Sequence, residues 1–575
     1  MDLVLVGLPG TGKTAVGRRL ARRHGAEFVD LDARIEAAAG RPIPAVFADE
    51  GEAGFRARER DAVTALGPAD PSPALRRVIA TGGGTPLDPR NRWALYRGRL
   101  AVWLDGPPGI LASRLRRSPV SRPLLAGRDP ESAIAALAAA RERVYAPALR
   151  VNGVASLARV VATVERHLED AAGLGGSLLR ARTPIGTLEI GDGIAASATT
   201  RAVAALEARR AIVVSEPKAW SVVGDALAAA LARDGIAVET VLLPRGEPAK
   251  KLRVIERAAR ELARLRAERG DPIVAVGGGA LGDAAGFLAA TWLRGVAVIH
   301  VPTTMVAQID SSIGGKTAVD LPEGKNLVGA FHQPAAIVAD VATLRTLPPR
   351  QLRAALGEAV KMGALGDERL LDLLEADGPA IAQGAGPAFD SGAVAEVVER
   401  CAWAKVEVVV ADERERGEAG GRIALNLGHS LAHAIEAVAG YRGILHGEAV
   451  AYGLRAATRI GAELGVTPPA RAQRIEALLD ALRLGVLPLG VRPEALVAAL
   501  GTDKKTSGGR LRWVLPTESG IVVRSDVPDG LVSAAAAGIV RGRPARGGRP
   551  ANGGRAAGGG RPDPGRRPTH RGRGR

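Results

Sequence analysis

"DLVLVGLPGTGKT", residues 2–14, carries an apolar strand pattern directly into a glycine-rich turn, and a helical stretch follows that turn. Residues 7–14 fit G-x-x-x-x-G-K-[ST], the phosphate loop of nucleotide-binding enzymes. In such a loop the backbone N–H groups and the helix N-terminus cradle a phosphate, Lys13 reaches the phosphoryl group that is transferred, and Thr14 holds Mg²⁺. Because the chain contains 73 Gly, the flanking strand and helix are better evidence than the glycines alone. The stretch predicts a parallel-sheet domain that binds the phosphates of a nucleotide.

Apolar β-branched runs alternate with amphipathic helical stretches along most of the chain, which predicts α/β units with crossover helices. The pattern stops in a Gly-rich segment near residues 167–186, restarts at "AIVVSEP" (211–217), and gives way to helical segments after about Leu344. A length of 575 residues predicts two to four domains. We expect a first unit at 1–168, a linker at 169–183, an α/β half at 184–345, a helical half at 346–535 and a tail at 541–575.

The formal net charge of +17 is concentrated at the end of the chain. Residues 541–575 hold eleven Arg and one Asp, a net charge of +10, and few apolar side chains with which to build a core. We expect this basic tail to be disordered. Its Arg–Gly composition fits weak binding of RNA or another polyanion, but a compositionally drifted extension is the favoured interpretation. The main activity is not expected to require nucleic acid.

A cytoplasmic location is expected from three features of the sequence. The single cysteine, Cys401, excludes an internal disulfide framework, fits a reducing compartment, and is best interpreted as a small buried apolar residue. Met1 runs into the first strand without a basic leader. Apolar runs such as "AAGFLAATWL" (284–293) are too short to span a bilayer, so no membrane association is expected.

Carboxylates and guanidinium groups follow the predicted strands of the first unit. Asp30 and Asp32 end "FVDLD", where carboxylates can face the crevice at the edge of a parallel sheet. "TGGGT", residues 81–85, ends the next strand and lets a substrate touch the backbone. Arg56 and Arg141 suit bidentate capture of a carboxylate, although a single Arg is more often a solvated surface residue. Together these groups predict a small kinase for an anionic acceptor.

Residues 1 to about 165 resemble shikimate kinase, a nucleoside-monophosphate-kinase-like P-loop enzyme. "GLPGTGKTAVGRRLA", "FVDLDARIE", "FADEGEAGFRARE", "ATGGGTP" and "SRPLL" occur in the family's order, and "SRPLLAG" (121–127) has the character of a mobile lid. The resemblance implies phosphorylation of shikimate by ATP–Mg²⁺, with Asp32 orienting the acceptor hydroxyl or taking its proton. It implies ATP contacts from Gly10, Thr11, Gly12, Lys13, Thr14, Ala15 and Arg122, Mg²⁺ on Thr14, and shikimate contacts from Asp32, Arg56, Gly83 and Arg141.

Three of the eight histidines lie in "HSLAHAIEAVAGYRGILHGE", residues 429–448. His429 and His433 fall on one face of a predicted helix, and His446 follows a Gly-containing turn. A zincin needs H-E-x-x-H, but position 430 is Ser, which disfavours a metalloprotease. Two of these histidines with a remote carboxylate, for which Glu358 in "LGEAVK" is the candidate, would leave a coordination position open, as catalytic zinc requires. On spacing alone, core or helix-capping histidines remain the alternative.

Two further segments of the second unit indicate nucleotide and phosphate binding. "VAVGGGALGD" (274–283) places glycines after a strand, and such a turn admits a pyrophosphate, although it is not G-x-G-x-x-G. "VPTTMVAQIDSSIGGKTAVDLPEGKN" (301–326) contains two Lys and an Asn that suit a phosphorylated anion. A merely solvated loop fits poorly because the flanking residues are small and apolar. The polar residues gathered here are Thr303, Thr304, Asp310, Lys316, Lys325 and Asn326, with Arg294 just upstream.

Residues from about 180 to 530 resemble 3-dehydroquinate synthase, because "GGGALGD", "PTT", "DSSIGGKTAVD", "GKN", "FHQP", "GEAVK", "LNLGHSLAHAIE", "HGEAV" and "DKK" occur in the family's order. The resemblance implies a Rossmann-like NAD-binding α/β half and a mainly helical metal-binding half. The implied reaction converts 3-deoxy-D-arabino-heptulosonate 7-phosphate to 3-dehydroquinate and phosphate, with NAD oxidising a ring carbinol and later returning the hydride. The implied ligands of Zn²⁺ or Co²⁺ are Glu358, His429 and His446, while His433 faces the substrate.

The same resemblance assigns further residues of the second unit. Lys316, Lys325 and His433 are implied as catalytic. The implied NAD contacts are Glu247, Lys250, Gly278, Gly279, Asp283, Thr303, Thr304, Lys316, Lys325, Thr343 and Thr346. The implied contacts to the phosphorylated substrate are Arg294, Asp310, Asn326, Lys361, Lys405, Glu415, Arg422, Asn426, Lys504 and Lys505.

Two segments depart from the family pattern. The first nucleotide-binding turn reads "SEP" where the family often has Asp, so Glu216 is the expected substitute. "DERERGEAGGR" (412–422) is about three residues longer than usual, which leaves Glu415 and Glu418 as alternatives for the pocket Glu and the position of Arg422 open.

The two resemblances together predict a bifunctional enzyme of chorismate and aromatic amino acid biosynthesis. It would act on small molecules and form a homodimer through the synthase half. A chain in which one half is only a scaffold is the alternative, disfavoured because every phosphate, metal and lysine position of both patterns is filled.

Overall fold

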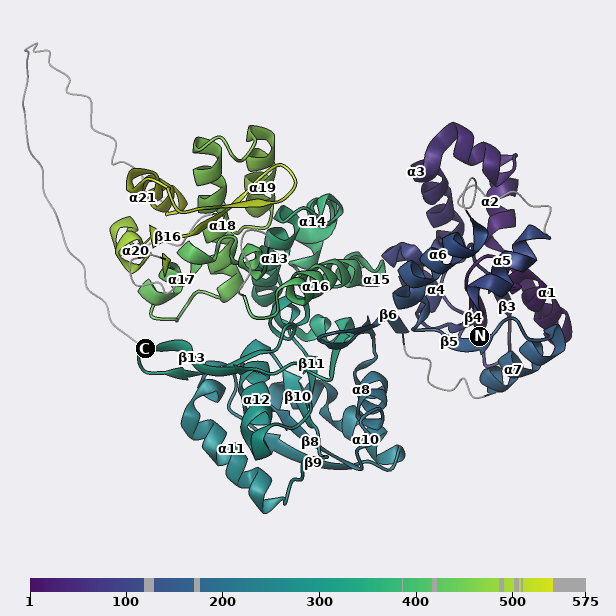
Figure 1. Ribbon diagram of the computed structural model, residues 1–575, viewed down its shortest axis with the longest axis horizontal. Coiled ribbons are helices and arrows are strands. Elements are labelled where there is room, and N and C mark those ends of the chain that lie inside the picture. The colour runs from purple at the N-terminus through teal and green to yellow at the C-terminus, as the bar shows by residue number, and fades with distance from the viewer. Residues whose placement is uncertain are drawn as a thin grey trace, which may run out of the picture.

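The computed structural model describes residues 1–117, 129–169, 176–384, 386–415, 421–485, 491–500, 506–507 and 510–540 (Figure 1). The predicted lid at 121–127 and the basic tail at 541–575 lie outside these residues. Within the described residues, no helix combines the length and apolar character needed to cross a membrane.

The first unit is built on five parallel strands in the order β2-β3-β1-β4-β5, which confirms the expected parallel-sheet domain. Alternate residues of β1 face opposite ways: Leu3 and Leu5 pack under α1 and α7, whereas Val4 and Val6 pack under α4, α5 and α6. Helices α2 and α3 pack on each other beside this body (Figure 1). The bounds are β1 (Asp2–Val6), α1 (Lys13–His24), β2 (Glu27–Asp30), α2 (Leu31–Ala39), α3 (Ile43–Thr64), β3 (Arg77–Ala80), α4 (Pro89–Tyr96), β4 (Leu100–Asp105), α5 (Pro108–Arg116), α6 (Pro130–Tyr145), β5 (Leu149–Asn152) and α7 (Leu157–Glu169).

The second unit begins with a seven-stranded sheet in the order β6-β7-β14-β11-β10-β8-β9, parallel except for β6. Helices α8 and α10 cover one face of the sheet, and α11 and α12 cover the other. The strand order reverses between β8 and β10, where Rossmann-like sheets open a crevice at the strands' carboxyl ends. The bounds are β6 (Gly176–Thr183), β7 (Gly186–Asp192), α8 (Ala195–Ala204), β8 (Arg210–Ser215), α9 (Pro217–Ala219), α10 (Asp225–Arg233), β9 (Ala237–Leu242), α11 (Leu252–Arg264), β10 (Ile273–Gly277), α12 (Gly279–Thr291), β11 (Val298–Pro302) and β14 (Ala336–Asp340).

Strand β6 lies inside the range 169–183 that we expected to be a linker. Its Leu178 and Leu179 are buried, and it pairs antiparallel with β7. Two consecutive apolar residues beside several glycines were too short a pattern to indicate a strand. The segment after β11 forms the hairpin β12 (Lys316–Leu321) and β13 (Gly324–Phe331), in line with the expectation that it is not merely a solvated loop.

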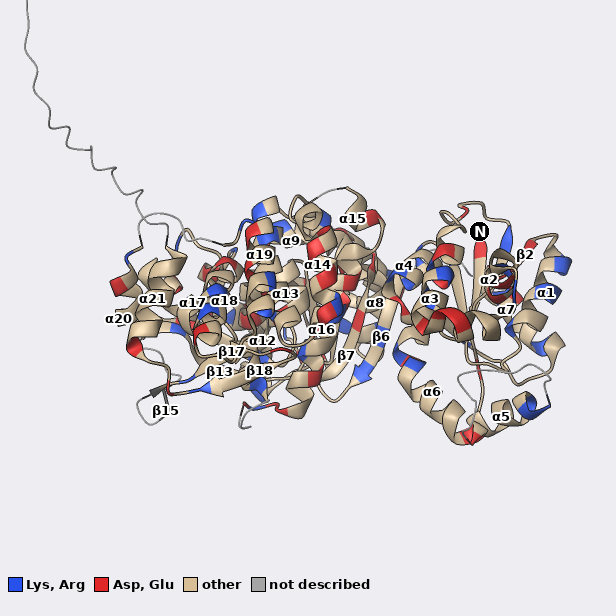
Figure 2. Cartoon of the chain, turned by 90° about the horizontal axis from the view of Figure 1, so that it is seen from above, with Lys and Arg blue, Asp and Glu red and all other residues tan. Residues whose placement is uncertain are grey.

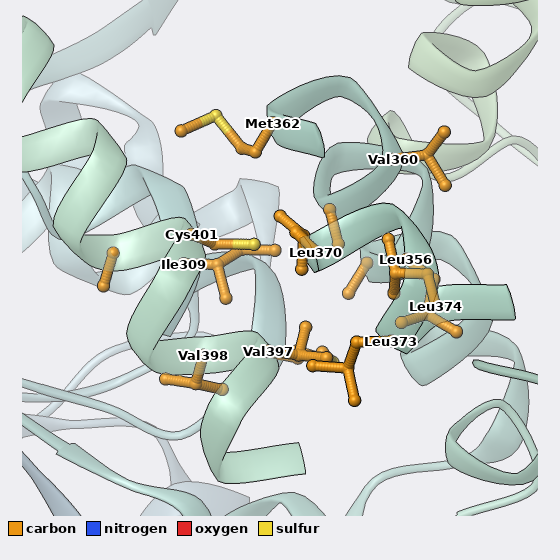
Figure 3. Close-up of a cluster of buried hydrophobic side chains, with 14 of the residues drawn as sticks. Ile309, Leu356, Val360, Met362, Leu370, Leu373, Leu374, Val397, Val398 and Cys401 are labelled. Carbon is orange, nitrogen blue, oxygen red and sulfur yellow. The ribbon is translucent and has the colours of Figure 1, made fainter. Parts of the chain in front are cut away.

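The helical half surrounds α18, which is buried along most of its length. Figure 3 shows the packing of α13, α14 and α16, where the Cys401 thiol lies beside Ile309 and Leu370. Burial raises the pKa of this thiol, which fits the expected apolar role. The bounds are α13 (Pro349–Ala364), α14 (Glu368–Ile381), α15 (Pro387–Asp390), α16 (Ala393–Ala411), α17 (His429–Val438), α18 (His446–Glu463), α19 (Pro469–Ala481), α20 (Pro493–Leu500), β15 (Thr506–Ser507), β16 (Arg510–Leu511), β17 (Trp513–Pro516), β18 (Ile521–Arg524) and α21 (Asp529–Ile539).

One buried apolar cluster continues from the first unit into the helical half. It contains Val4 and Trp93 from the first unit, Leu179 from β6, and Leu356 and Val397 from the helical half. Figure 2 shows α4 at the junction between the first unit and the rest of the chain. The two units therefore share a core across their junction.

Candidate active sites

The phosphate loop has the geometry that its sequence predicts. Gly7, Gly10 and Gly12 all have positive φ, and a Cβ on Gly7 would lie 2.3 Å from the Leu104 carbonyl oxygen, so a larger residue would not fit there. The Lys13 ammonium donates to the carbonyls of Gly7 and Leu8 at 2.8 and 3.1 Å. The loop thus holds a cation over the N-terminus of α1, where a phosphate would lie.

A cavity of about 720 Å³ opens beside this loop and brings together the predicted kinase residues. Its wall includes the phosphate loop, the turn that follows β3 (residues 81–85, here called the β3 turn) and the side chains of Asp32, Arg56 and Arg141. Asp32 lies in the first turn of α2 and not at the end of a strand, because the helix begins directly after Asp30. Thr14 Oγ1 donates to Asp30 Oδ2 at 3.0 Å, which adds a carboxylate beside the expected Mg²⁺ position. Arg122 lies outside the described residues.

The three glycines of the β3 turn each face one functional side chain. A Cβ on Gly82 would lie 2.8 Å from Asp32 Oδ1, one on Gly83 would lie 3.0 Å from Arg141 Nη1, and one on Gly84 would lie 2.6 Å from Arg56 Nη1. The turn must therefore lack side chains if a carboxylate and two guanidinium groups are to converge on it. This convergence suits a small hydroxylated carboxylic acid as acceptor.

Two residues outside the predicted acceptor contacts support this turn: Glu59, which lies in the same sequence motif as Arg56, and Tyr145, which sequence reasoning missed. Glu59 is 1% exposed, pairs with Arg56 at 2.7 Å and accepts from Thr85 Oγ1 at 2.6 Å. The Tyr145 hydroxyl donates to the Gly83 carbonyl, which also accepts from Arg141 at 2.8 Å. Glu59 lies three residues after Arg56, a helical spacing that could have suggested the pair.

The second unit has a cavity of about 310 Å³ at the crevice between β8 and β10. The predicted nucleotide residues Gly278, Gly279, Thr303, Thr304 and Thr346 line it, as does Glu216, the expected substitute in the first turn; the Glu216 carboxylate accepts from the Gly246 N–H at 3.2 Å. His446 lies in the same wall. A nucleotide in this crevice would therefore lie beside the histidines.

Other predicted nucleotide residues lie outside the wall of that cavity. Lys250 is buried and pairs with Asp283 at 2.6 Å, and it also donates to Asn326. Burial raises the pKa of Asp283 to about 6, although the Lys250 ammonium works in the opposite direction. Lys325 pairs with Glu247 at 2.9 Å. Thr343 is buried and donates to the Asp340 carbonyl at 2.7 Å, so its hydroxyl has a structural partner.

Glu358, His429 and His446 form a candidate metal centre. They come from α13, α17 and α18, and their nearest ligand atoms all lie within 4.8 Å of one another. The Nε2 atoms of His429 and His446 lie 3.7 and 3.3 Å from Glu358 Oε1. Both Glu358 oxygens are buried, and among the described residues neither has a partner in regular hydrogen-bond geometry, although Lys361 Nζ lies 2.5 Å from Oε2. A buried carboxylate facing two imidazoles fits a divalent transition metal.

The second ring nitrogen of each histidine is oriented by the fold. His429 Nδ1 lies 3.2 Å from the Leu427 carbonyl, and His446 Nδ1 lies 3.3 Å from Glu436 Oε1. Partners of this kind fix the ring orientation of metal ligands. Burial would lower the pKa of His446, but the Glu358 and Glu436 carboxylates raise it to about 10. Glu436 is a further residue that the sequence did not single out.

His433 lies next to the metal centre but outside the ligand set. Its ring centroid is 5.7 Å from that of His429, in an edge-on arrangement. The convergence of the His429 and His446 rings on Glu358 favours a metal centre over a core or capping role for these two histidines.

The predicted substrate residues fall into two connected groups. In the buried group Asp310 lies 2.5 Å from Lys405 and 3.9 Å from Lys361, which adjoins Glu358. Burial would raise the pKa of Asp310, but the two ammonium groups lower it. The rim group is held by Glu415, which accepts from Lys316 at 2.6 Å and from Asn426 at 2.9 Å.

Five further predicted residues are not among these two groups. Arg294 is exposed, with a positive φ of 70°, and among the described residues no hydrogen bond or ion pair joins it to the two groups. Lys504, Lys505 and Glu418 lie outside the described residues. Arg422 is buried and donates to the carbonyls of Glu413 and Gly314 at 2.6 and 3.1 Å.

The fold and sites define a phosphate-loop kinase unit joined to a Rossmann-like unit with a nucleotide crevice and a metal centre. Family models agree: shikimate kinase matches residues 9–167, and the N-terminal and C-terminal models of 3-dehydroquinate synthase match residues 240–354 and 355–506. The 3-dehydroquinate synthase of Symbiobacterium thermophilum is 44% identical over 329 residues, 56% of this chain and 89% of that protein.

Two solved structures also resemble the second unit. One is 2-epi-5-epi-valiolone synthase from Streptomyces hygroscopicus subsp. jinggangensis with NAD⁺ and Zn²⁺ bound. It is 28% identical with a TM-score of 0.55, and the match covers 60% of this chain and 94% of that chain. The other is 2-deoxy-scyllo-inosose synthase complexed with carbaglucose-6-phosphate, NAD⁺ and Co²⁺. It is 26% identical with a TM-score of 0.50, and the match covers 61% of this chain and 96% of that chain. The chain belongs to the 3-dehydroquinate synthase family, and its first unit belongs to the shikimate kinase family. It therefore combines two enzymes of the shikimate pathway.

Proposed function

We propose that the first unit phosphorylates shikimate at the turn formed by residues 81–85. The observation that carries this assignment is the one-to-one placement of Asp32, Arg141 and Arg56 on the three glycines. The guanidinium groups would hold the acceptor carboxylate, and Asp32 would accept a hydrogen bond from the hydroxyl that attacks the γ-phosphate. Lys13 and Thr14 would hold the phosphates of ATP and Mg²⁺.

Replacing Asp32 with Asn should preserve ATP binding and reduce phosphoryl transfer by about 10²–10⁴-fold, because the amide cannot take the hydroxyl proton. The turnover number and a separate titration of ATP binding measure the two effects. Asp61→Asn, at an exposed position of α3, is the matched control and should keep the wild-type rate. Wild-type turnover in Asp32→Asn would show that the acceptor site has been assigned to the wrong residues.

For the second unit we propose that NAD lies in the crevice between β8 and β10, with Zn²⁺ or Co²⁺ on Glu358, His429 and His446. The contribution of His446 to both the cavity wall and the metal cluster supports placing the two cofactors side by side. When bound, the metal would polarise the substrate hydroxyl that is oxidised. His433 would face the same substrate, and a phosphate group would be held by Lys316, Lys325 and Asn326 at the rim.

Both units would act on small-molecule substrates, and the second unit would carry out the synthase reaction. 3-Deoxy-D-arabino-heptulosonate 7-phosphate would lose its phosphate in the second unit while NAD is reduced and then reoxidised, so no net oxidant is consumed. Lys361, Lys405 and Asp310 form a buried charged floor beside the metal centre and would orient the ring of the substrate. A purified chain assayed for both reactions tests the assignment directly, and activity in one unit alone would favour a scaffold role for the other.

We also propose that the chain acts in the cytoplasm as a homodimer formed through the synthase half. The support for a dimer is the free edge at β9, which ends the seven-stranded sheet and exposes 51% of Leu242. Sedimentation should give twice the chain mass of 59.2 kDa. A species of a single chain mass at micromolar concentration would rule the dimer out.

A further inference from the structure

Arg92 joins the kinase unit to the synthase unit. It lies on α4, just after the glycine turn of the acceptor site, and its side chain is completely buried. One guanidinium nitrogen donates to the carbonyls of Pro86 and Leu87, in the short helix that follows the three glycines. The other terminal nitrogen donates to the carboxylate of Glu399 on α16. A single buried cation thus holds both the carbonyls that directly follow the acceptor turn and a carboxylate of the synthase half.

The surroundings of this ion pair are a specific interface. Arg90 pairs with Glu396 at 3.1 Å and with Asp377 at 2.7 Å, and Trp93 Nε1 donates to the Asp390 carbonyl at 2.7 Å. Glu396 is 1% exposed and Trp93 is 5% exposed, so water is excluded from most of the junction. The continuous apolar cluster is typical of a permanent interface. The buried charges inside it all have partners, as they must, because an unpaired buried charge is costly.

The acceptor turn depends on this interface through a short chain of contacts. The Gly83 carbonyl accepts from Arg141 at 2.8 Å and from Tyr145, and Thr85 is tied to Glu59 at 2.6 Å. Arg92 holds the next carbonyls along the chain. Without the Glu399 carboxylate, a guanidinium that is shielded from water would lose its counter-charge and would move toward solvent or another acceptor. The turn that it holds would then move with it.

We propose that Glu399, although it belongs to the synthase half, is a positioning residue for the shikimate site of the kinase half. It touches neither substrate, and it acts through Arg92 on the turn that presents Gly83 and Gly84 to the acceptor. The inference rests on the proposed function of the first unit. Its consequence is that recognition of shikimate, but not of ATP, depends on a side chain of the synthase.

The test uses the full chain carrying Glu399→Gln, which keeps the size of the side chain and removes its charge. The KM for shikimate should rise on the order of tenfold or more, because small displacements of positioning groups have effects of this size. The KM for ATP and the synthase activity should stay at wild-type values, and the synthase assay shows that the variant is folded. Asp377→Asn is the matched control, since it removes another ion pair across the same junction without touching Arg92, and it should leave the shikimate KM unchanged.

A double-mutant cycle tests whether Glu399 acts on the shikimate site through Arg92. Arg92→Met should raise the shikimate KM as Glu399→Gln does, and the double variant should be no worse than either single variant, because the two residues act as one pair. If Glu399→Gln does not fold, Glu399→Asp carries the same test with a retained charge and a shorter reach. An unchanged shikimate KM in the folded variant would overturn the proposal, as would equal losses in both KM values or the same effect in Asp377→Asn. If the wild-type chain itself does not phosphorylate shikimate, the proposed function fails instead.

Discussion

A chain with His446 replaced by Ala should lose its bound metal and its dehydroquinate synthesis together, while shikimate phosphorylation continues at the wild-type rate. His446 Nε2 lies 3.3 Å from Glu358 Oε1, and with it gone only Glu358 and His429 remain of the candidate ligands. Two protein ligands are too few to hold a catalytic Zn²⁺ tightly. Metal content of the purified variant, with both activities measured on the same sample, checks this result.

Two further variants make the metal experiment decisive. His433→Ala should keep about one metal per chain and still slow turnover, because its ring lies beside His429 without belonging to the ligand cluster. Glu436→Gln should weaken metal affinity by about 10–100-fold without removing the metal, since it only orients His446 through Nδ1. If His433→Ala is the variant without metal and His446→Ala keeps its metal, our ligand assignment is wrong.

Replacing Lys13 with Ala should lower shikimate phosphorylation by on the order of 10²–10³-fold and leave dehydroquinate synthesis intact. The expected size is that of removing one preorganised charge-stabilising group from a reaction centre. Lys13 is the only lysine among residues 1–168, a unit otherwise rich in Arg, and a compact ammonium at this position fits between the loop carbonyls and a phosphate. Steady-state assays of both reactions on one preparation give the answer.

The synthase activity is the internal control for Lys13→Ala. The loop lies on the β1–α1 turn, whereas the contacts with the synthase come from α4 and α6, so the variant should not disturb the second unit. Loss of both activities in a folded Lys13→Ala chain would contradict two separate active sites. Loss of neither would remove the phosphate loop from the mechanism.

Much of each site could be predicted because its residues are local in sequence. The phosphate loop is one strand–turn–helix unit, and the glycines at 82–84 follow a strand with an unambiguous apolar pattern. The metal ligands could not be predicted from local sequence, because Glu358 is about 70 residues from His429. Only the family resemblance indicated that they lie together, as they do in the structure. Spacing alone left the histidines undecided.

The features that sequence reasoning missed depend on tertiary contact. Glu436 on α17 contacts the imidazole of His446 on α18, and Tyr145 on α6 donates to the Gly83 carbonyl in the β3 turn. No local pattern distinguishes these two residues from ordinary surface residues. Strand β6 is defined by its pairing with β7 more than by its own composition. Glu415 contacts Lys316 and Asn426, and because Glu418 lies outside the described residues, the choice between the two glutamates stays a prediction.

The apolar cluster that runs from β1 into α16 has a consequence for dividing this gene. A synthase expressed without the kinase would present to water the face of α15 and α16 on which Trp93 now packs. Glu399 would lose its contact with Arg92, and Glu396 would lose Arg90 while keeping its pair with Arg400. A kinase expressed alone would expose Trp93 and an unpaired Arg92. Free-standing relatives of either half would need a polar surface at the corresponding place. Transplanting one half of this chain into another host protein would require redesign of that face before either piece could remain in solution.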